Sequence, residues 1–184
     1  MVLVLFVFVN CANAYNYRKV TDDDRIVAAL KVLEDTNSQE TLERIFNNSA
    51  KHPVQIIFYD LGMISYEYKN HFATVSDDNF GDVYIIIHTA YRNAPKEALA
   101  ALIAHEAVHL AYPTENIDNE VKATSAEALQ WSKCLAKYPN LKFDSTNLLI
   151  ARLNGLVEIY NTAGAEGIDK KITSNPFYAE HFSN

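Results

Sequence analysis

The chain has 184 residues, of which 49% are hydrophobic and 21% are charged, with only 5 glycines and 5 prolines. This composition excludes collagen-like, low-complexity and intrinsically disordered chains, and the length suits one domain with one sizeable core. The formal net charge is −7, from 16 Lys and Arg against 23 Asp and Glu, and no basic run occurs. We therefore expect no nucleic-acid partner.

The first 14 residues have the pattern of a signal peptide. Val2–Val9 is an unbroken apolar stretch, and Ala12-Asn13-Ala14 has the small-x-small pattern that signal peptidases cut. About eight apolar residues are too few to span a bilayer, so the pattern predicts a secreted or periplasmic protein of residues 15–184 without a membrane span. Two alternatives stay open. One is a lipid anchor at Cys11, although the residues before it fit a lipoprotein motif poorly. The other is a buried N-terminal strand. After cleavage Cys134 is the only cysteine, and we interpret it as a small core residue.

Hydrophobic periodicity divides the rest of the chain into helices on either side of a β-prone region. Apolar residues at helical spacing predict helices over Asp22–Glu34 and Gln39–Asn47. Alternating or continuous β-prone residues then predict about three strands, at Val54–Phe58, Tyr66–Tyr68 and Val83–Ile87. Helical patterns return over Pro95–Ala111, Asp118–Lys137 and Asp144–Asn161, and the aromatic tail Ser174–Asn184 is expected to dock. The predicted fold class is α+β, with a small, mostly antiparallel sheet packed on a helical domain.

One predicted helix carries the pattern His105-Glu106-Ala107-Val108-His109. Two histidines at i and i+4 lie about 40° apart on one helical face, within reach of a single metal ion. Imidazole nitrogens suit Zn²⁺, which in catalytic sites takes three protein ligands and a water. Glu106 could accept a proton from that water. The alternative is a pair of hydrogen-bonded core histidines without a metal.

The next predicted helix offers a third ligand. Glu120 and Glu127 share its apolar face, which is unusual for unpaired carboxylates. If the two helices are antiparallel, Glu120 lies level with His109, and Glu127 lies about 10 Å further along, near the level of His105. We expect Glu120 to bind the metal and Glu127 to orient one of the histidines. The reverse assignment stays open, as does an ordinary surface or salt-bridged role for both carboxylates.

These residues resemble the gluzincin metallopeptidases of the zincin superfamily. His105–His109 matches their His-Glu-x-x-His helix, and Asn119–Ala123 is similar to their Asn-Glu-x-x-Ala/Ser element, whose Glu is a zinc ligand. The strand Val83–Ile87 resembles their edge strand, which pairs with extended substrate. The resemblance covers about Asp82–Leu135 and implies a compact, zincin-like domain that hydrolyses peptide bonds. It also implies a zinc ion held by His105, His109 and Glu120, with Glu106 as general base.

The leading hypothesis is therefore a secreted zinc-dependent peptidase that acts on a peptide or protein substrate. No motif marks the group that would stabilise the transition state, and the candidates are Tyr160, Tyr178, Tyr112 and His88. The alternative function is a catalytically inactive zinc-binding module or scaffold of the same fold. A helical-core protein without metal is the third hypothesis. No pattern indicates an oligomeric state.

Overall fold

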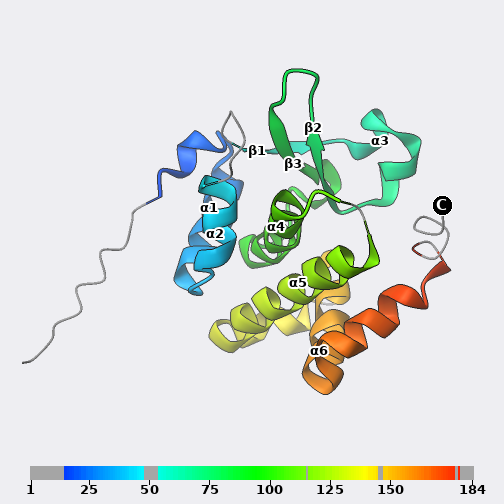
Figure 1. Cartoon of the computed structure of the whole chain (residues 1–184). Coiled ribbons are helices and arrows are strands. Elements are labelled where there is room, and N and C mark those ends of the chain that lie inside the picture. Colours follow the sequence, from blue (N-terminus) through cyan, green and yellow to red (C-terminus); the bar gives the residue numbers. More distant parts are fainter. Residues whose placement is uncertain (1–14, 48–53, 115, 145–146, 177, 179–184) are drawn as a thin grey trace, which may run out of the picture.

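A computed structural model describes residues 15–47, 54–114, 116–144, 147–176 and 178. Within these residues the chain folds as α+β, which confirms the predicted class: six α-helices and several 3-10 helices accompany a three-stranded sheet (Figure 1). The predicted signal peptide, residues 1–14, and Cys11 within it lie outside the described residues, so both remain predictions. None of the described helices is long and apolar enough to cross a membrane.

The helical and extended segments follow one another closely along the chain. The α-helices are α1 (Asp24–Asp35), α2 (Gln39–Phe46), α3 (Leu61–Ile64), α4 (Lys96–Ala111), α5 (Ile117–Lys137) and α6 (Leu148–Thr173). The strands are β1 (Gln55–Tyr59), β2 (Ala73–Asp77) and β3 (Val83–His88). The 3-10 helices are η1 (Tyr17–Lys19), η2 (Tyr66–Asn70), η3 (Thr89–Tyr91) and η4 (Pro139–Phe143).

The sheet is mixed, with the strand order β1-β3-β2. β1 runs parallel to β3, with Ile56 opposite Ile85, and β2 runs antiparallel to β3, with Val75 opposite Ile85. One of the two pairings is thus parallel, where the sequence predicted a mostly antiparallel sheet. The difference arises because the chain leaves β1 through α3 and η2 and enters β2 first, and only then returns along the hairpin to pair β3 with β1.

Two of the strand predictions need correction. β3 is the central strand, so the prediction that Val83–Ile87 forms the edge of the sheet is wrong. Its unbroken apolar run is the pattern of a strand that has neighbours on both sides and is buried on both faces. Tyr66–Tyr68 is not a strand but lies in η2, where the Ser65 side chain accepts a hydrogen bond from the Glu67 backbone amide. The third strand is β2, and it forms an edge of the sheet.

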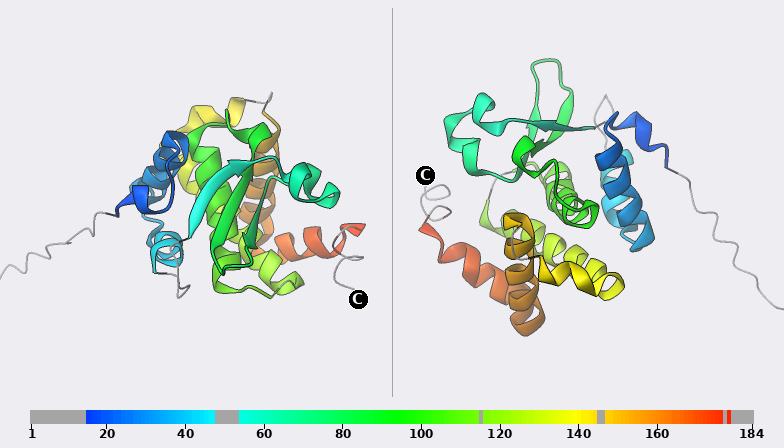
Figure 2. Two further views of the ribbon diagram at one scale, coloured as in Figure 1. Left: turned by 90° about the horizontal axis from the view of Figure 1, so that it is seen from above. Right: turned by 180° about the vertical axis from the view of Figure 1, so that it is seen from behind.

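α4 is the central helix of the fold. Every residue from Glu97 to Val108 is buried, and the helix lies between the sheet and α5 (Figure 2). Pro95 immediately precedes it, as the sequence predicted. Because the helix is buried from Glu97 to Val108, the polar side chains on this stretch are placed inside the protein, where an unpaired polar group is costly.

α6 is longer than predicted and bends. It continues past the predicted end at Asn161 to Thr173, with a non-helical residue at Gly164, where φ is 62° and ψ is −152°. Glycine tolerates these angles because it has no Cβ. Beyond the bend, α6 contributes to a small apolar cluster formed by Ala128, Leu156, Ile168 and Ile172, against which Tyr178 of the tail packs. Docking of the tail is confirmed at Tyr178; residues 177 and 179–184 lie outside the described residues.

Cys134 is a core residue, as predicted. Its side chain is fully buried and is not part of a disulfide. The Gln130 amide nitrogen donates to its sulfur at 3.5 Å. Burial, the largest influence, raises the pKa of the Cys134 thiol to about 11, which is unfavourable for a nucleophile at neutral pH.

Candidate metal centre

α4 and α5 bring the predicted ligands to one another. His105 and His109 project from α4, and Glu120 projects from the first turns of α5. The start of α5 is fixed locally: the Asn116 side chain accepts a hydrogen bond from the Asn119 backbone amide at 2.9 Å, and the Asn119 side chain donates to the Thr114 carbonyl at 2.8 Å. This capping sets where the helix begins and therefore which residue of its first turns faces α4.

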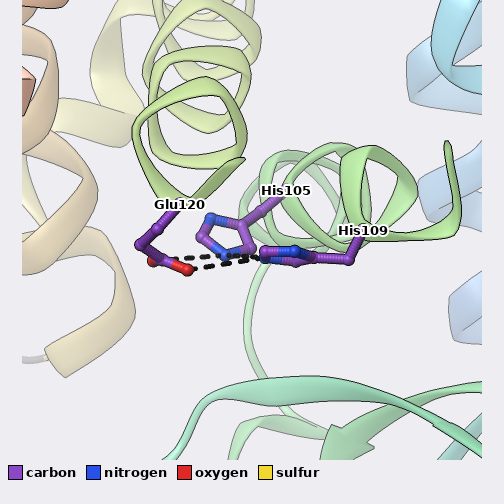
Figure 3. A group of neighbouring side chains, drawn as sticks. All are labelled: His105, His109 and Glu120. Atoms are coloured by element: carbon purple, nitrogen blue, oxygen red, sulfur yellow. Dashed lines mark hydrogen bonds and ion pairs between the residues drawn. The ribbon is translucent and has the colours of Figure 1, made fainter. Parts of the chain in front are cut away.

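The ligand atoms of His105, His109 and Glu120 converge on one point (Figure 3). The two Nε2 atoms are 3.2 Å apart, Oε1 of Glu120 is 3.6 Å from Nε2 of His105, and Oε2 is 3.5 Å from Nε2 of His109. A tetrahedral metal ion with bonds of about 2.1 Å separates its ligand atoms by roughly 3.4 Å. All three distances are close to that value. Two imidazoles and one carboxylate can therefore hold a metal ion here.

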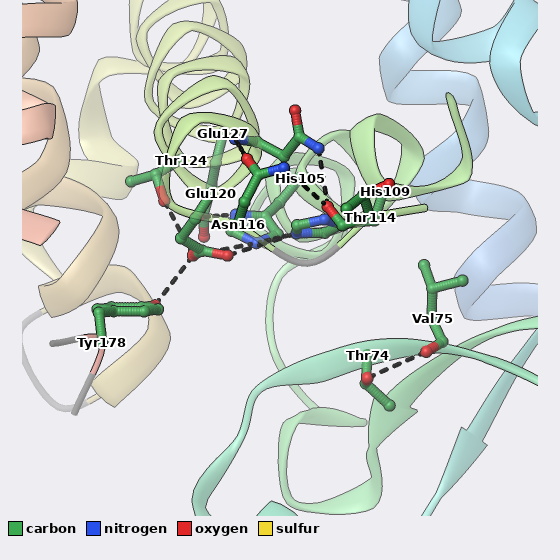
Figure 4. Close-up of polar contacts among 11 residues, drawn as sticks. Thr74, Val75, His105, His109, Thr114, Asn116, Glu120, Thr124, Glu127 and Tyr178 are labelled. Carbon is green, nitrogen blue, oxygen red and sulfur yellow. Dashed lines mark hydrogen bonds and ion pairs between the residues drawn. The ribbon is translucent and has the colours of Figure 1, made fainter. Parts of the chain in front are cut away.

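Glu127 lies against the other ring nitrogen of His105 (Figure 4). Its Oε2 is 3.1 Å from Nδ1 of His105, and its Oε1 accepts a hydrogen bond from the Arg152 guanidinium on α6. Burial opposes ionisation, but the Arg152 charge and the His105 contact lower the pKa of Glu127. An ionised carboxylate can only accept, so Nδ1 of His105 carries the hydrogen and Nε2 faces His109 and Glu120. This is the orienting contact that the sequence predicted for Glu127.

The charges around the two imidazoles shift the proton equilibria of the cluster. Burial lowers the pKa of His105, but the Glu127 contact and the nearby carboxylates outweigh it and raise that pKa to about 9. Burial likewise raises the pKa of Glu120, but contacts with His109 and His105 outweigh it and hold that pKa at about 2. The neighbouring carboxylates thus favour the protonated form of His105 when no metal is bound. A metal ion that binds here displaces the proton on Nε2 of His105.

The Glu120 carboxylate also forms hydrogen bonds with residues other than the two histidines. Its Oε1 accepts a hydrogen bond from the Tyr178 hydroxyl at 2.9 Å and one from Thr124 Oγ1 at 3.3 Å. Figure 4 shows Tyr178 reaching this carboxylate from the opposite side to the histidines. The carboxylate is thus positioned by α5 itself and by the tail that follows α6.

Glu106 lies beside the first histidine on α4 and is 4% exposed. In the described part of the chain its carboxylate has no hydrogen bond or ion pair, whereas Glu120 and Glu127 have both. Burial, the largest influence, raises the pKa of Glu106 above its ordinary value. A largely buried carboxylate that forms no hydrogen bond with the described residues and lies next to a possible metal centre has the properties of a proton acceptor.

The four candidates for a transition-state donor are dispersed in the structure. Tyr178 contacts Glu120, whereas Tyr160 packs against the small apolar cluster. Tyr112 follows α4 and is 43% exposed, and His88 ends β3, where its Nδ1 caps η3. Of the four, Tyr178 is the one whose side chain forms a hydrogen bond with the cluster of His105, His109 and Glu120 in the described residues.

Arg152 is a site residue that the sequence reasoning missed. It follows Leu149 by three positions and precedes Leu156 by four, so it lies at helical spacing with the apolar stripe of α6. Besides its ion pair with Glu127, its guanidinium lies 4.8 Å from the centre of the Phe72 ring. A positively charged residue at helical spacing with apolar residues is the sequence feature that could have identified Arg152 as a partner for a buried carboxylate.

β2, which forms an edge of the sheet, contacts α4, the helix that carries His105 and His109. Thr74 and Val75 of β2 lie on the sheet side of His109 in Figure 4. Among the described residues β2 pairs with β3 alone. The backbone groups along its other edge are therefore available to a further extended segment.

Comparisons with known proteins assign no family to the chain. No protein-family model, no curated protein and no solved structure matches it. The resemblance to gluzincins is therefore a proposal, and the local geometry of α4 and α5 is its support.

Proposed function

We propose that this chain is a zinc-dependent peptidase of the gluzincin type. The observation that carries the proposal is the spacing of three ligand atoms, from His105, His109 and Glu120, at 3.2 to 3.6 Å from one another. Two imidazole nitrogens and one carboxylate oxygen are a ligand set that zinc takes in catalytic sites, with the fourth position left for water. Glu106, which is largely buried and forms no hydrogen bond with the described residues, would supply the proton acceptor that such a site needs.

The chain's own residues have distinct roles in this proposal. His105, His109 and Glu120 would hold the ion, and Glu127 fixes the orientation of His105. When bound, zinc supplies Lewis acidity, which lowers the pKa of a water to about 7 and polarises the substrate carbonyl. Glu106 accepts the proton of the attacking water and delivers it to the nitrogen of the broken peptide bond, which leaves as an amine. Glu106 thereby returns to its ionised state after each turnover.

The substrate we propose is an extended peptide that pairs with β2. A peptide backbone can add to an open sheet edge through main-chain hydrogen bonds, and β2 has such an edge on the side of the cluster. β3 is the central strand and already has a neighbour on each side, so a peptide cannot pair with it. Thr74 and Val75 of β2 lie on the His109 side of the three ligands in Figure 4, so we propose that a peptide on β2 runs past His109.

We also propose secretion, to the medium or the periplasm. The support is the sequence pattern of residues 1–14, with an apolar core followed by a small-x-small cleavage site. Mass spectrometry of the mature protein tests this proposal. It predicts an N-terminus at Tyr15.

The alternative is a zinc-binding module without peptidase activity. One observation favours it: the Tyr178 hydroxyl donates to Glu120, so in this arrangement it is not directed at a substrate. Tyr160, Tyr112 and His88 form no hydrogen bond with the cluster in the described residues. In this alternative the ion would stabilise the α4–α5 pair, and hydrolysis would be absent even in the zinc-loaded protein.

The experiment that separates these functions compares metal content with hydrolysis. The purified protein is loaded with Zn²⁺, its stoichiometry is measured by atomic emission, and a peptide library is digested with and without a chelator. We expect one zinc per chain and cleavage that the chelator abolishes. One zinc per chain without cleavage would support the inactive module, and no bound zinc would contradict both functions.

A matched pair of variants tests the role of Glu106. Glu106→Gln removes the proton acceptor but none of the three ligands, so we expect zinc to bind and hydrolysis to fall at least about 100-fold, the range for general acid–base catalysis. Glu97→Gln is the control, because Glu97 is also buried on α4 but lies more than two turns away, close to Lys96. Undiminished turnover in Glu106→Gln would exclude the mechanism.

A further inference from the structure

We propose that Tyr178 is a positioning residue, which fixes the Glu120 carboxylate in the orientation that a metal ion needs; this inference rests on the proposed metal site. The Tyr178 hydroxyl donates to Oε1 of Glu120 at 2.9 Å from a position 58 residues further along the chain. The same oxygen receives only one other hydrogen bond, from Thr124 Oγ1 at 3.3 Å, among the described residues. Tyr178 thus makes the shorter of the two contacts and the only one from outside α5.

The Glu120 carboxylate needs such a contact because it lies between two imidazoles. One of its oxygens is 3.6 Å from Nε2 of His105 and the other is 3.5 Å from Nε2 of His109. A carboxylate in the first turns of a helix can rotate about its side-chain bonds and exchange these partners. A fixed donor on one oxygen selects one rotamer before the metal arrives, and hydrogen bonds of this kind to a ligand raise metal affinity.

Tyr178 is held in place by packing that does not involve the ligands. Its ring packs against the small apolar cluster of α5 and α6, whose buried members are Ala128, Leu156, Ile168 and Ile172. The bend at Gly164 separates Leu156 from Ile168, so the second half of α6 leaves the direction of the first. Figure 1 shows this second half, in orange and red, running alongside the start of α5 toward the C-terminal end. The C-terminal part of the chain therefore completes a site whose ligands come from α4 and α5.

The test removes one oxygen atom. Tyr178→Phe keeps the ring that packs against the small apolar cluster of α5 and α6 and deletes only the hydroxyl, so the variant is expected to fold. We expect its dissociation constant for Zn²⁺, measured by competition with a chromophoric chelator, to rise about 10-fold, the lower end of the range for residues that orient ligands. The visible absorption spectrum of the Co²⁺-loaded protein is expected to change as well, because it reports the coordination of the ion.

Tyr17→Phe is the matched control. The Tyr17 hydroxyl donates to a carboxylate oxygen of Glu34 at 2.5 Å, so this variant deletes the same kind of hydrogen bond in another part of the fold. It is expected to bind Zn²⁺ as the wild type does. If the wild type binds Zn²⁺ and Tyr178→Phe binds it with the same affinity, the positioning role is overturned and the metal site stands. If the wild type binds no Zn²⁺, the proposed function is overturned and this inference with it.

A further outcome distinguishes positioning from a direct part in the reaction. An unchanged Zn²⁺ affinity together with a large fall in kcat would place the Tyr178 hydroxyl on the substrate, and would overturn the inference. An increased dissociation constant with kcat restored at saturating zinc would support it. Both results come from the same Tyr178→Phe protein that is used for the metal titration.

Discussion

Nδ1 of His105 lies 3.1 Å from Oε2 of Glu127, and the other oxygen of that carboxylate is bound by Arg152. Three helices therefore contribute in series to the orientation of one imidazole: α6 through Arg152, α5 through Glu127 and α4 through His105. Glu127 is completely buried, and such a carboxylate persists in a core only when both its charge and its lone pairs are satisfied. The arrangement fixes which nitrogen of His105 is presented to a metal.

Removing the charge of Glu127 should affect both stability and metal binding. In Glu127→Gln the Arg152 guanidinium loses its counter-charge, and breaking a buried pair in this way costs about 3 kcal/mol. Glutamine keeps one acceptor oxygen where the carboxylate has two, so it cannot accept fully from both Arg152 and Nδ1 of His105. The contact that fixes the His105 tautomer is therefore weakened, and we expect Zn²⁺ affinity to fall about 10-fold. Urea unfolding and a zinc titration measure the two effects. Glu158→Gln, an exposed change on α6, is the control and should leave both unchanged.

Zinc itself should stabilise the folded chain, and a chelator should reverse the effect. At a free concentration of about 1,000 times its dissociation constant, a ligand that binds only the folded state contributes about 4 kcal/mol. For a chain of this size that corresponds to a rise in Tm of roughly 8–16 °C. Differential scanning calorimetry with zinc and with a chelator measures it.

The histidine variants identify the source of that stabilisation. His109→Ala removes one of the three ligands and should abolish most of the zinc-dependent rise in Tm. His71→Ala removes a histidine that lies between η2 and β2 and is not one of the three ligands, so this variant should retain the rise. An equal response of the two variants would show that zinc binds somewhere else.

The parts of the site that the sequence predicts are those set by local geometry. His105 and His109 share a helical face because four residues make slightly more than one turn, and this holds in any fold. Glu120 and Glu127 were predicted on the same grounds, from one face of the following helix. An antiparallel arrangement of the two helices, which the short loop between them favours, then placed Glu120 level with His109 and Glu127 near the level of His105.

The parts that were missed depend on contacts between distant segments. β3 was placed at the edge of the sheet because of the resemblance to gluzincins, although its unbroken apolar run is typical of a strand with neighbours on both sides. Arg152 has no local reason to approach Glu127, since the two residues come from different helices. Gly164 is one of several glycines in the sequence, and only its backbone angles show that the helix bends there.

Stability should fall at high pH through Cys134. Burial raises the pKa of its thiol to about 11 in the folded chain, against about 8.5 in an unfolded one. The folded state therefore holds this proton more tightly, and the stabilisation is complete below about pH 8.5 and is lost as the pH rises toward 11.

Comparison with a variant isolates this contribution from that of other groups. In Cys134→Ala the thiol is absent from both states, so the free energy of unfolding should fall less steeply with pH. We expect the two slopes to differ by up to about 1.4 kcal/mol per pH unit between pH 9 and 11. Urea unfolding at several pH values measures both slopes. Parallel curves would show that the thiol already ionises in the folded protein.

Gly164 and Gly155 form a matched pair within α6. A Cβ at either position would meet no atom within 4 Å, but only Gly164 has a positive φ, of 62°. Gly164→Ala should therefore destabilise the fold by about 1–3 kcal/mol through backbone strain alone. Gly155→Ala should stabilise it by up to about 1 kcal/mol, because alanine favours a helix. Urea unfolding gives both values.

The same pair also tests whether the bend contributes to the metal site. Relief of the strain in Gly164→Ala requires the end of α6 to move, and Tyr178 would then lose its contact with Glu120. Zinc affinity should fall in Gly164→Ala as it does in Tyr178→Phe, and it should be unchanged in Gly155→Ala. A Gly164→Ala protein that is less stable but binds zinc with wild-type affinity would show that the tail keeps its place without the bend.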